Sequence, residues 1–349
     1  MFKNKSVMII GEGDLLETKL CFVLLQRYPE LKRLIIYSRN KEKQEEMQRL
    51  LPDNRKIKYC LGGVLQRRKL MSLMRGVDYL LCLGDYPAVK DSYGADLLRY
   101  YLNGTENIIQ AALARNVEKV LVLSSEKACN PIDMSGTAKL CVEKLILAAG
   151  KGKESAGKDT KFSILRYGKA INGPEGLVTR LRKQAENGCL YLEDINATRF
   201  WFTIDHCVTW LIKALMTMEG GEVFVPQTPS LRMMDLAQVI CPLCQIKQMG
   251  IEEGHKLHEL LITEEEGYRT KEFPDHYLIT EELNQESQEE DDDNDNGDEN
   301  EDKNKNEYGA TKGRPVFPGF LYSSATNYNN LNEEELSILV LHRMKREEK

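Results

Sequence analysis

Residues 118–144 have the sequence EKVLVLSSEKACNPIDMSGTAKLCVEK and decide the fold that we predict for the whole chain. The apolar run Val120–Leu123 predicts a buried strand, and a polar loop over residues 124–127 follows it directly. A helical pattern then begins near Asp133 or Ser135 and carries a lysine on its apolar side. In an open α/β sheet, ligands bind at the carboxyl ends of the strands. The stretch therefore predicts a ligand-binding loop between a central strand and a helix.

Strands and helices alternate on both sides of this stretch. The predicted strands are Val7–Ile10, Leu34–Tyr37, Lys56–Leu61, Val77–Leu83 and Phe162–Arg166. Helical patterns lie over residues 15–26, 41–51, 70–74, 95–115 and 177–187. Strands that alternate with helices imply a parallel sheet with right-handed crossovers. The fold class is therefore α/β, with a Rossmann-type doubly wound parallel sheet.

The 349 residues are enough for one large α/β domain and a smaller lobe. We expect a dinucleotide-binding domain over residues 1–170 and a substrate-binding lobe over residues 171–282 that returns in places to the sheet. Residues 283–310 form an acidic, Asn-rich insert that is too polar to bury a core and should be disordered. A C-terminal strand and an amphipathic helix are expected over residues 311–349.

The acidic insert also accounts for the net charge of the chain. Residues 289–302 contain ten acids and no base, so the formal charge of −6 becomes +4 for the remainder. A mildly basic body fits a phosphate-bearing ligand but not a nucleic-acid-binding protein. No apolar run reaches the length of about 18 residues that predicts a membrane span.

The nine cysteines are scattered, which predicts buried thiols in a reducing cytoplasm rather than a disulfide framework. Cys241-x-x-Cys244, followed by His255 and His258, resembles the spacing of zinc ligands. The two histidines are one residue closer than in the usual pattern. We therefore predict no metal site.

Several long stretches, in chain order, carry a family resemblance. They are LIIYSRNKEKQEEM, NGTENIIQAALARNVEKVLVLSSEKACNP, TKFSILRYGK, ATRFWFTIDH, GGEVFVPQTPSLRMMDLA, GHKLHELLI and SSATNYNNLNEEEL. The chain resembles the inverting UDP-N-acetylglucosamine 4,6-dehydratases of polysaccharide and flagellin-sugar biosynthesis, which are extended short-chain dehydrogenase/reductases. The resemblance implies a bound NADP that oxidises C4 of the sugar, elimination of water across C5 and C6, and return of the hydride to C6.

The resemblance assigns roles to the central stretch residue by residue. In the family, the tyrosine of a Tyr-x-x-x-Lys pair takes the C4 hydroxyl proton, and a neighbouring Asp-Lys pair handles the elimination. Lys139 matches the first lysine and Ser125 a hydroxyl that steadies the substrate, while Glu126 and Lys127 match the Asp-Lys pair. The tyrosine position is Ser135. A serine hydroxyl is far less acidic than a phenol, whose pKa is about 10, and its side chain is several ångströms shorter.

The cofactor turn departs from the family pattern as well. Of the Gly-x-x-Gly-x-x-Gly motif only Gly11 is kept, because Asp14 and Glu17 stand at the second and third positions; Gly13 could re-register the turn. Glycines there let the backbone approach a pyrophosphate. Carboxylates beside a diphosphate are repulsive. The adenine-binding acid of the family is replaced by Gly63.

Other family contacts are retained. The resemblance implies that Ser38 and Arg39 bind the 2′-phosphate of NADP. It also implies that Ser124 and Lys139 contact this cofactor. It assigns the substrate to Arg199 and Glu259, and also to Lys169, which replaces an asparagine of the family. Alternatively, Arg199 binds no ligand, and the TRFW segment that contains it serves only the packing of the lobe.

The altered positions favour a dehydratase homologue with a degraded active site, inactive or weakly active, whose NADP binding is weakened or lost. Such a protein would bind a UDP-sugar and act as a binding or regulatory subunit, in a homo-oligomer or with an active relative. The alternatives are an active NADP-dependent UDP-sugar 4,6-dehydratase and a purely structural subunit.

Overall fold

The computed structural model describes residues 2–52, 54–84, 94–151, 160–168, 176–281, 313–327, 329, 331 and 336. Lys169, the acidic insert and nearly all of the predicted C-terminal helix lie outside the described residues.

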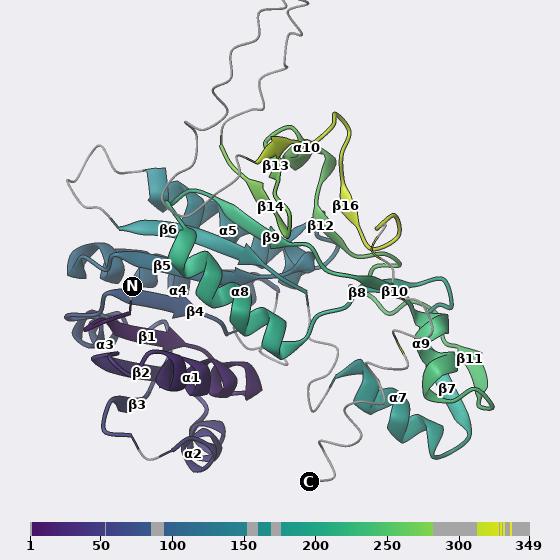
Figure 1. Ribbon diagram of the computed structural model, residues 1–349, viewed down its shortest axis with the longest axis horizontal. Helices are drawn as coiled ribbons and strands as arrows, with labels where there is room; N and C mark the ends of the chain where they lie inside the picture. Colours follow the sequence, from purple (N-terminus) through teal and green to yellow (C-terminus); the bar gives the residue numbers. More distant parts are fainter. Residues whose placement is uncertain are drawn as a thin grey trace, which may run out of the picture.

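A large sheet forms the centre of the described chain (Figure 1). Its parallel strands are β1 (Ser6–Ile10), β2 (Arg33–Ser38), β3 (Ile57–Leu61), β4 (Tyr79–Cys82), β5 (Lys119–Ser124), β6 (Lys161–Arg166) and β9 (Val223–Pro226). Three antiparallel strands extend it beyond β9: β14 (His276–Ile279), β13 (Thr270–Glu272) and β15 (Arg314–Pro315). The order β3-β2-β1-β4-β5-β6 is that of the doubly wound dinucleotide-binding fold. The predicted fold class is confirmed.

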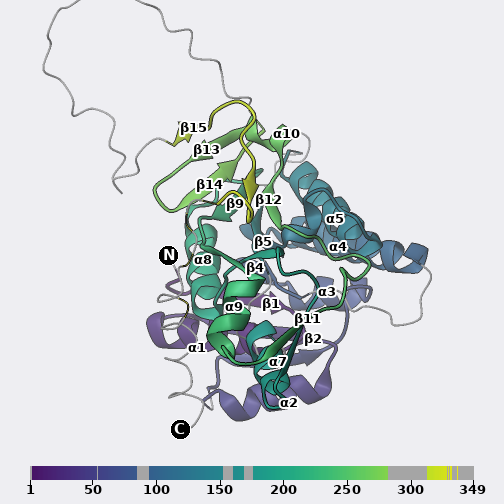
Figure 2. The same ribbon diagram turned by 90° about the vertical axis from the view of Figure 1, so that its right-hand side faces the viewer.

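Helices cover both faces of this sheet (Figure 2). On one face lie α3 (Arg67–Leu73), α4 (Gly94–Arg115) and α5 (Met134–Lys151), which contact one another in that order. On the other face α1 (Leu15–Arg27) packs against α8 (Ile204–Thr217). Helix α2 (Lys41–Leu50) connects β2 to β3. The chain changes faces between β1 and β4, and in folds of this class that crevice is where ligands bind.

A smaller lobe has its own apolar core, at the side of the sheet in Figure 1. Its elements are α7 (Leu177–Ala185), β7 (Cys189–Leu192), β8 (Thr198–Phe200), β10 (Ser230–Arg232), α9 (Met233–Ile240) and β11 (Gln245–Gln248). Leu336, from the predicted C-terminal helix, is buried in this core. Beside the sheet extension lie the short elements β12 (Leu260–Ile262), α10 (Glu264–Gly267) and β16 (Tyr322–Ser323), with α10 next to β13 in Figure 1. The domain boundaries drawn from the sequence stay a prediction.

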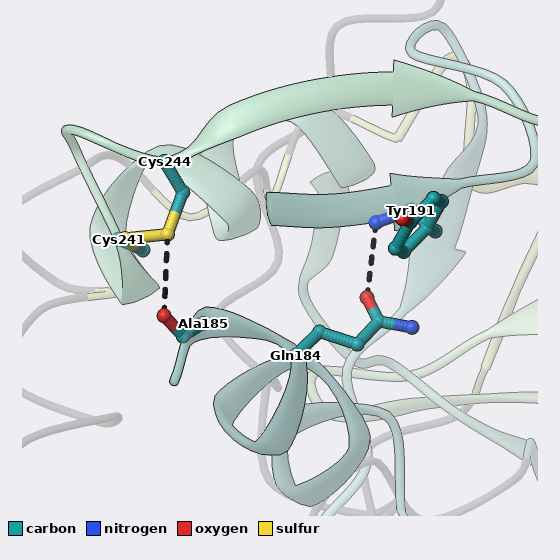
Figure 3. The surroundings of a disulfide bond; sticks show 5 residues. All are labelled: Gln184, Ala185, Tyr191, Cys241 and Cys244. Atoms are coloured by element: carbon teal, nitrogen blue, oxygen red, sulfur yellow. Dashed lines mark hydrogen bonds between the residues drawn. A yellow bond between two sulfur atoms is a disulfide. The ribbon is translucent and has the colours of Figure 1, made fainter. Parts of the chain in front are cut away.

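The cysteines differ from the sequence expectation at one place. Cys241 and Cys244 form a disulfide directly after α9, and the Cys244 sulfur lies 3.7 Å from the carbonyl oxygen of Ala185 at the end of α7 (Figure 3). On the same side of the lobe, Gln184 accepts a hydrogen bond from the backbone N–H of Tyr191, which ties α7 to β7. The expectation of nine thiols is therefore wrong for this pair, because a Cys-x-x-Cys spacing alone does not distinguish thiols from a bond. The other seven cysteines are free.

No helix in the described part of the chain is both long and apolar enough to cross a membrane.

A buried arginine joins the sheet to the segments that follow it. Arg166, the last residue of β6, is 1% exposed and pairs with Glu143 of α5 through Nε and Nη2, at 3.1 and 2.6 Å. Its Nη1 and Nη2 also donate to Glu266 of α10, at 2.8 and 2.9 Å, and Nη1 donates to the carbonyl oxygen of Leu261. Every nitrogen of the guanidinium is therefore hydrogen-bonded. Although burial raises the pKa of Glu266, Arg166 holds that pKa below its ordinary value.

Replacing Arg166 with methionine should destabilise the protein strongly. The Arg166→Met variant would leave the carboxylates of Glu143 and Glu266 buried without their cation, which costs about 3–5 kcal/mol. Urea unfolding measures the loss. The matched control is Lys213→Met, which removes the partly exposed ion pair with Asp275 and should cost below about 1 kcal/mol. Equal losses in the two variants would contradict this role for Arg166.

Candidate active site

Two adjoining pockets lie at the carboxyl ends of the central strands. The first, here the turn pocket, is lined by residues that include Gly11, Arg39 and Tyr100, and the second, the serine pocket, by Ser124 and Lys139 among others. Both pockets are also lined by Cys82 and Gly84. They therefore meet at the crevice between β1 and β4, where the fold predicts a ligand.

The predicted glycine turn shapes one wall of the turn pocket. Gly13 has a φ of +80°, a conformation that side chains rarely adopt, so glycine is needed at this position. A Cβ on Gly84 would lie 3.0 Å from the Cα of Gly11, so β4 and the turn approach closely. The carboxylate of Glu17, which is 2% exposed, lies directly over Gly11.

Ser38 and Arg39 both contact the turn. The Ser38 hydroxyl donates to the carbonyl oxygen of Glu12 at 3.1 Å. Arg39 pairs with the carboxylate of Glu12 at 3.3 Å and lies over the Tyr100 ring, 5.7 Å from its centroid. A Cβ on Gly63 would be 2.8 Å from Arg39 Cδ, so glycine at this position makes room for the arginine stem.

The serine pocket contains a buried hydroxyl without a protein partner. Ser124 is 7% exposed, and its Oγ has no hydrogen bond among the described residues. Ligands commonly satisfy such groups. Lys139 lines the same pocket from α5, and Ser135 lies one helical turn before it on that helix. The structure therefore brings Ser124 and Lys139 together, as the sequence predicts.

The Glu126-Lys127 segment forms the short helix η1 (Glu126–Ala128), which Ser125 caps by accepting a hydrogen bond from the N–H of Lys127. Lys127 pairs with Asp133 at 3.4 Å, so it is Asp133 and not Glu126 that balances its charge. Lys256 donates to the carbonyl oxygens of Glu126 and Cys129 and so fixes both ends of η1. Burial lowers the pKa of Lys256.

The carboxyl group of Glu259 lies near enough to Glu126 to feel its charge. It accepts a hydrogen bond from the N–H of Phe200 at 2.7 Å, and Ser324 holds its backbone at both the N–H and the carbonyl. Burial and the charge of Glu126 raise the pKa of Glu259 to about 8. Glu126 Oε2 is buried without a hydrogen bond among the described residues. Glu259 therefore keeps its proton near neutral pH.

Arg199 lies beside Glu259 and is already paired. Its Nη1 donates to two carbonyl oxygens, those of Thr198 and Leu257, at 2.8 and 2.9 Å. Its Nη2 lies 3.5 Å from a Glu193 carboxylate oxygen, and its Nε lies 3.6 Å from one of Glu259. The two zinc-like histidines have partners of their own: His255 pairs with Glu193, and His258 bonds Thr198.

The sequence reasoning did not single out Lys256, Asp133 or Glu193. Lys256 lies in the GHKLHELLI stretch, so the family resemblance was a signal for it, but nothing in its spacing indicates that it reaches η1. Its contacts cross about 130 residues of chain and depend on how the lobe packs.

Two comparisons place the chain among known proteins. A family model described as "Polysaccharide biosynthesis protein" matches residues 7–281. The chain belongs to this family. The inverting UDP-N-acetylglucosamine 4,6-dehydratase of Campylobacter jejuni subsp. jejuni serotype O:23/36 (strain 81-176) is 32% identical over 346 residues, which cover 98% of this chain and 99% of the relative. A UDP-glucose 4-epimerase of Rickettsia canadensis is 28% identical over 291 residues, covering 80% of this chain and 84% of the relative.

Solved structures agree with this assignment. Pen from Bacillus thuringiensis has a TM-score of 0.82 at 25% identity and covers 99% of both chains. DesIV, a dTDP-glucose 4,6-dehydratase from Streptomyces venezuelae solved with NAD and TYD bound, has a TM-score of 0.60 at 16% identity, covering 72% of this chain and 86% of its own; this likeness shows the fold alone. The predicted resemblance is confirmed: this member of the polysaccharide biosynthesis protein family is a nucleotide-sugar 4,6-dehydratase-like protein with an extended short-chain dehydrogenase/reductase fold.

The raised pKa of Glu259 predicts a pH dependence of stability. The folded protein keeps Glu259 protonated up to a pKa of about 8, whereas the unfolded chain releases that proton near the ordinary value of 4.5. Between these values the folded state binds more protons, so the free energy of unfolding should fall as the pH rises. Glu259→Gln should flatten this fall, measured by urea unfolding between about pH 5 and pH 9.

The control for this measurement is Glu264→Gln, which removes an exposed carboxylate from α10. That variant should keep the slope of the unchanged protein. An unaltered slope in Glu259→Gln would show that Glu259 ionises normally in the folded state.

Proposed function

We propose that this protein binds a nucleotide sugar but carries out 4,6-dehydration weakly or not at all, and acts as a binding or regulatory subunit. The observation that carries the proposal is Ser135, which occupies the proton-transfer position on α5, four residues before Lys139. Its Oγ is attached directly to Cβ, so it ends several ångströms short of a phenolic oxygen. Loss of a positioned acid/base group typically lowers a rate by about 10² to 10⁴.

The proposed ligand is a UDP-sugar, as in the name of the Campylobacter relative. Lys169, Arg199 and Glu259 remain its proposed contacts. Arg199 carries the charge that a diphosphate needs, but it would have to give up its pairing with Glu193 to bind one. This competition supports weak binding rather than tight binding.

The proposed cofactor is a nicotinamide dinucleotide, with NADP favoured by Arg39. The residues fit its two ends: Arg39 and Tyr100 line the turn pocket, while Ser124 and Lys139 line the serine pocket. When bound, the nicotinamide would accept a hydride and give it back. The residues do not fit its pyrophosphate, because the backbone amides of the turn are already bonded to Asp14 and Glu17. The proposal therefore includes weakened cofactor binding.

The proposed setting is the cytoplasm, in a homo-oligomer or with an active relative. The seven free cysteines, four of them buried, are compatible with a reducing compartment.

A specific observation favours a second candidate, an active dehydratase. Glu259 holds a proton near neutral pH, and Glu126, whose charge contributes to that raised pKa, is followed in the chain by Lys127. Elimination of water needs a group that gives a proton to the leaving hydroxyl, and this pair of carboxyl groups could supply it. The first step, removal of the C4 hydroxyl proton, would then depend on Ser135 through a water.

Incubation with UDP-N-acetylglucosamine and added NADP distinguishes the two candidates. Mass spectrometry measures the 4-keto-6-deoxy product. We expect this product to form about 10² to 10⁴ times more slowly than with an inverting dehydratase assayed beside it. Calorimetric titration with UDP-N-acetylglucosamine should still show binding. Ser135→Ala is the matched control and should leave the residual rate unchanged. A rate equal to that of the reference enzyme, or one lost in Ser135→Ala, would favour the active enzyme.

A further inference from the structure

The backbone amides of the glycine turn are bonded to two carboxylates of the chain itself. Glu17 accepts from the N–H of Glu12 through Oε1 and from the N–H of Asp14 through Oε2, both at 3.1 Å. Asp14 accepts from the N–H of Leu16 at 3.1 Å and from the N–H of Glu17. Free amides at a strand-to-helix turn form a binding site for anions. Here two acidic side chains of the chain itself occupy that site, and burial together with the neighbouring Asp14 raises the pKa of Glu17 well above its ordinary value.

The Glu17 side chain also fills the space that a ligand would need. A Cβ placed on Gly11 would lie 2.0 Å from Glu17 Oε1 and 2.8 Å from its Cδ. Glycine at this position normally lets a phosphate approach the backbone. The clearance over Gly11 is therefore taken by the carboxyl group of Glu17, which is 2% exposed.

A third acidic side chain pairs with the cation beside the turn. Arg39 pairs with Glu12, which belongs to the same turn, at 3.3 Å. Glu12 is thus bonded at its side chain to Arg39 and at its N–H to Glu17. The turn amides donate to Asp14 and Glu17, and Arg39 pairs with Glu12. All of these donors are therefore bonded to acidic side chains from residues 12–17. The described residues add no other cation to this wall of the pocket.

We propose that Glu17 is an internal substitute for the pyrophosphate, and that it sets the dinucleotide affinity of this protein by holding the turn closed. A dinucleotide must displace the Glu17 carboxylate from two amides before its own phosphates can bond to them. It must do so next to Asp14, whose charge remains. This inference rests on the proposed function only for the identity of the ligand.

The contacts of Glu17 also form a capping box, in which the Asp14 and Glu17 side chains each bond the backbone at the other residue. A capping box stabilises a helix end. Two contacts go beyond that role: the bond to the N–H of Glu12, which lies outside the helix, and the close approach to Gly11. A residue that only capped α1 would affect the stability of the helix and leave ligand affinity unchanged.

The test is the dissociation constant of NADP, and separately of NAD, measured by calorimetry on the full chain and on Glu17→Ala. Alanine keeps the Cβ of Glu17 and removes the carboxylate, so it frees both amides and the space over Gly11. We expect Glu17→Ala to bind at least tenfold more tightly than the unchanged protein. Glu17→Gln keeps the volume and one oxygen that can still accept from a turn amide, so it should tighten binding by a smaller factor.

Asp14→Asn is the matched control. Asparagine is as good a helix N-cap as aspartate, so this variant removes a nearby charge without opening the space over Gly11. Its affinity should change less than that of Glu17→Ala. Thermal unfolding of each variant shows whether α1 is kept, and Glu17→Gln gives the answer if Glu17→Ala does not fold.

Two results would overturn the inference: a submicromolar dissociation constant in the unchanged protein, or an unchanged constant in Glu17→Ala and Glu17→Gln. Titration of the same samples with UDP-N-acetylglucosamine tests the proposed function independently, because that ligand has no contact with the turn amides in this proposal. Binding of the sugar nucleotide with unaltered dinucleotide affinity would reject only the role of Glu17.

Discussion

The candidate site depends on the buried ion network of Arg166. One guanidinium joins the end of β6 to α5 through Glu143 and to α10 through Glu266. Helix α5 carries Ser135 and Lys139, while the segment before α10 carries Lys256 and Glu259. Buried ion pairs add little net stability over apolar packing. Their bidentate geometry is directional, however, so this one fixes the angle at which the two halves of the site meet.

Much of the fold could be predicted from the sequence, because strands β1 to β6 are apolar runs separated by helical patterns. The sheet beyond β6 could not. Strands β9, β13, β14 and β15 have two to four residues each, too few for a period of two to be seen. They belong to the sheet because of long-range pairing, as between His276 and Pro226. The spacing of Cys241 and Cys244 likewise could not show that the two cysteines form a disulfide.

The candidate site was predictable in its residues but not in its contacts. The strand-to-helix stretch indicated Ser124, Glu126 and Lys139, and the structure places Ser124 and Lys139 in one pocket. Which acid balances which base was not predictable: Lys127 pairs with Asp133, and Arg199 with Glu193 and Glu259. The sequence indicated repulsion between Glu17 and a diphosphate. The inward orientation of this carboxylate depends on the turn geometry and appears only in three dimensions.

The position of β9 limits how the protein can be divided. This strand comes from the second half of the chain, yet it lies between β6 and β14 inside the main sheet. A fragment ending near residue 170 would expose the flank of β6 as an open edge, with unpaired amides and carbonyls that invite aggregation. The same fragment would retain Arg166 and Glu143 but lose Glu266. The first 170 residues thus lack the neighbour that β6 has in the sheet, and any recombination of this half with another lobe would have to bring β9 along.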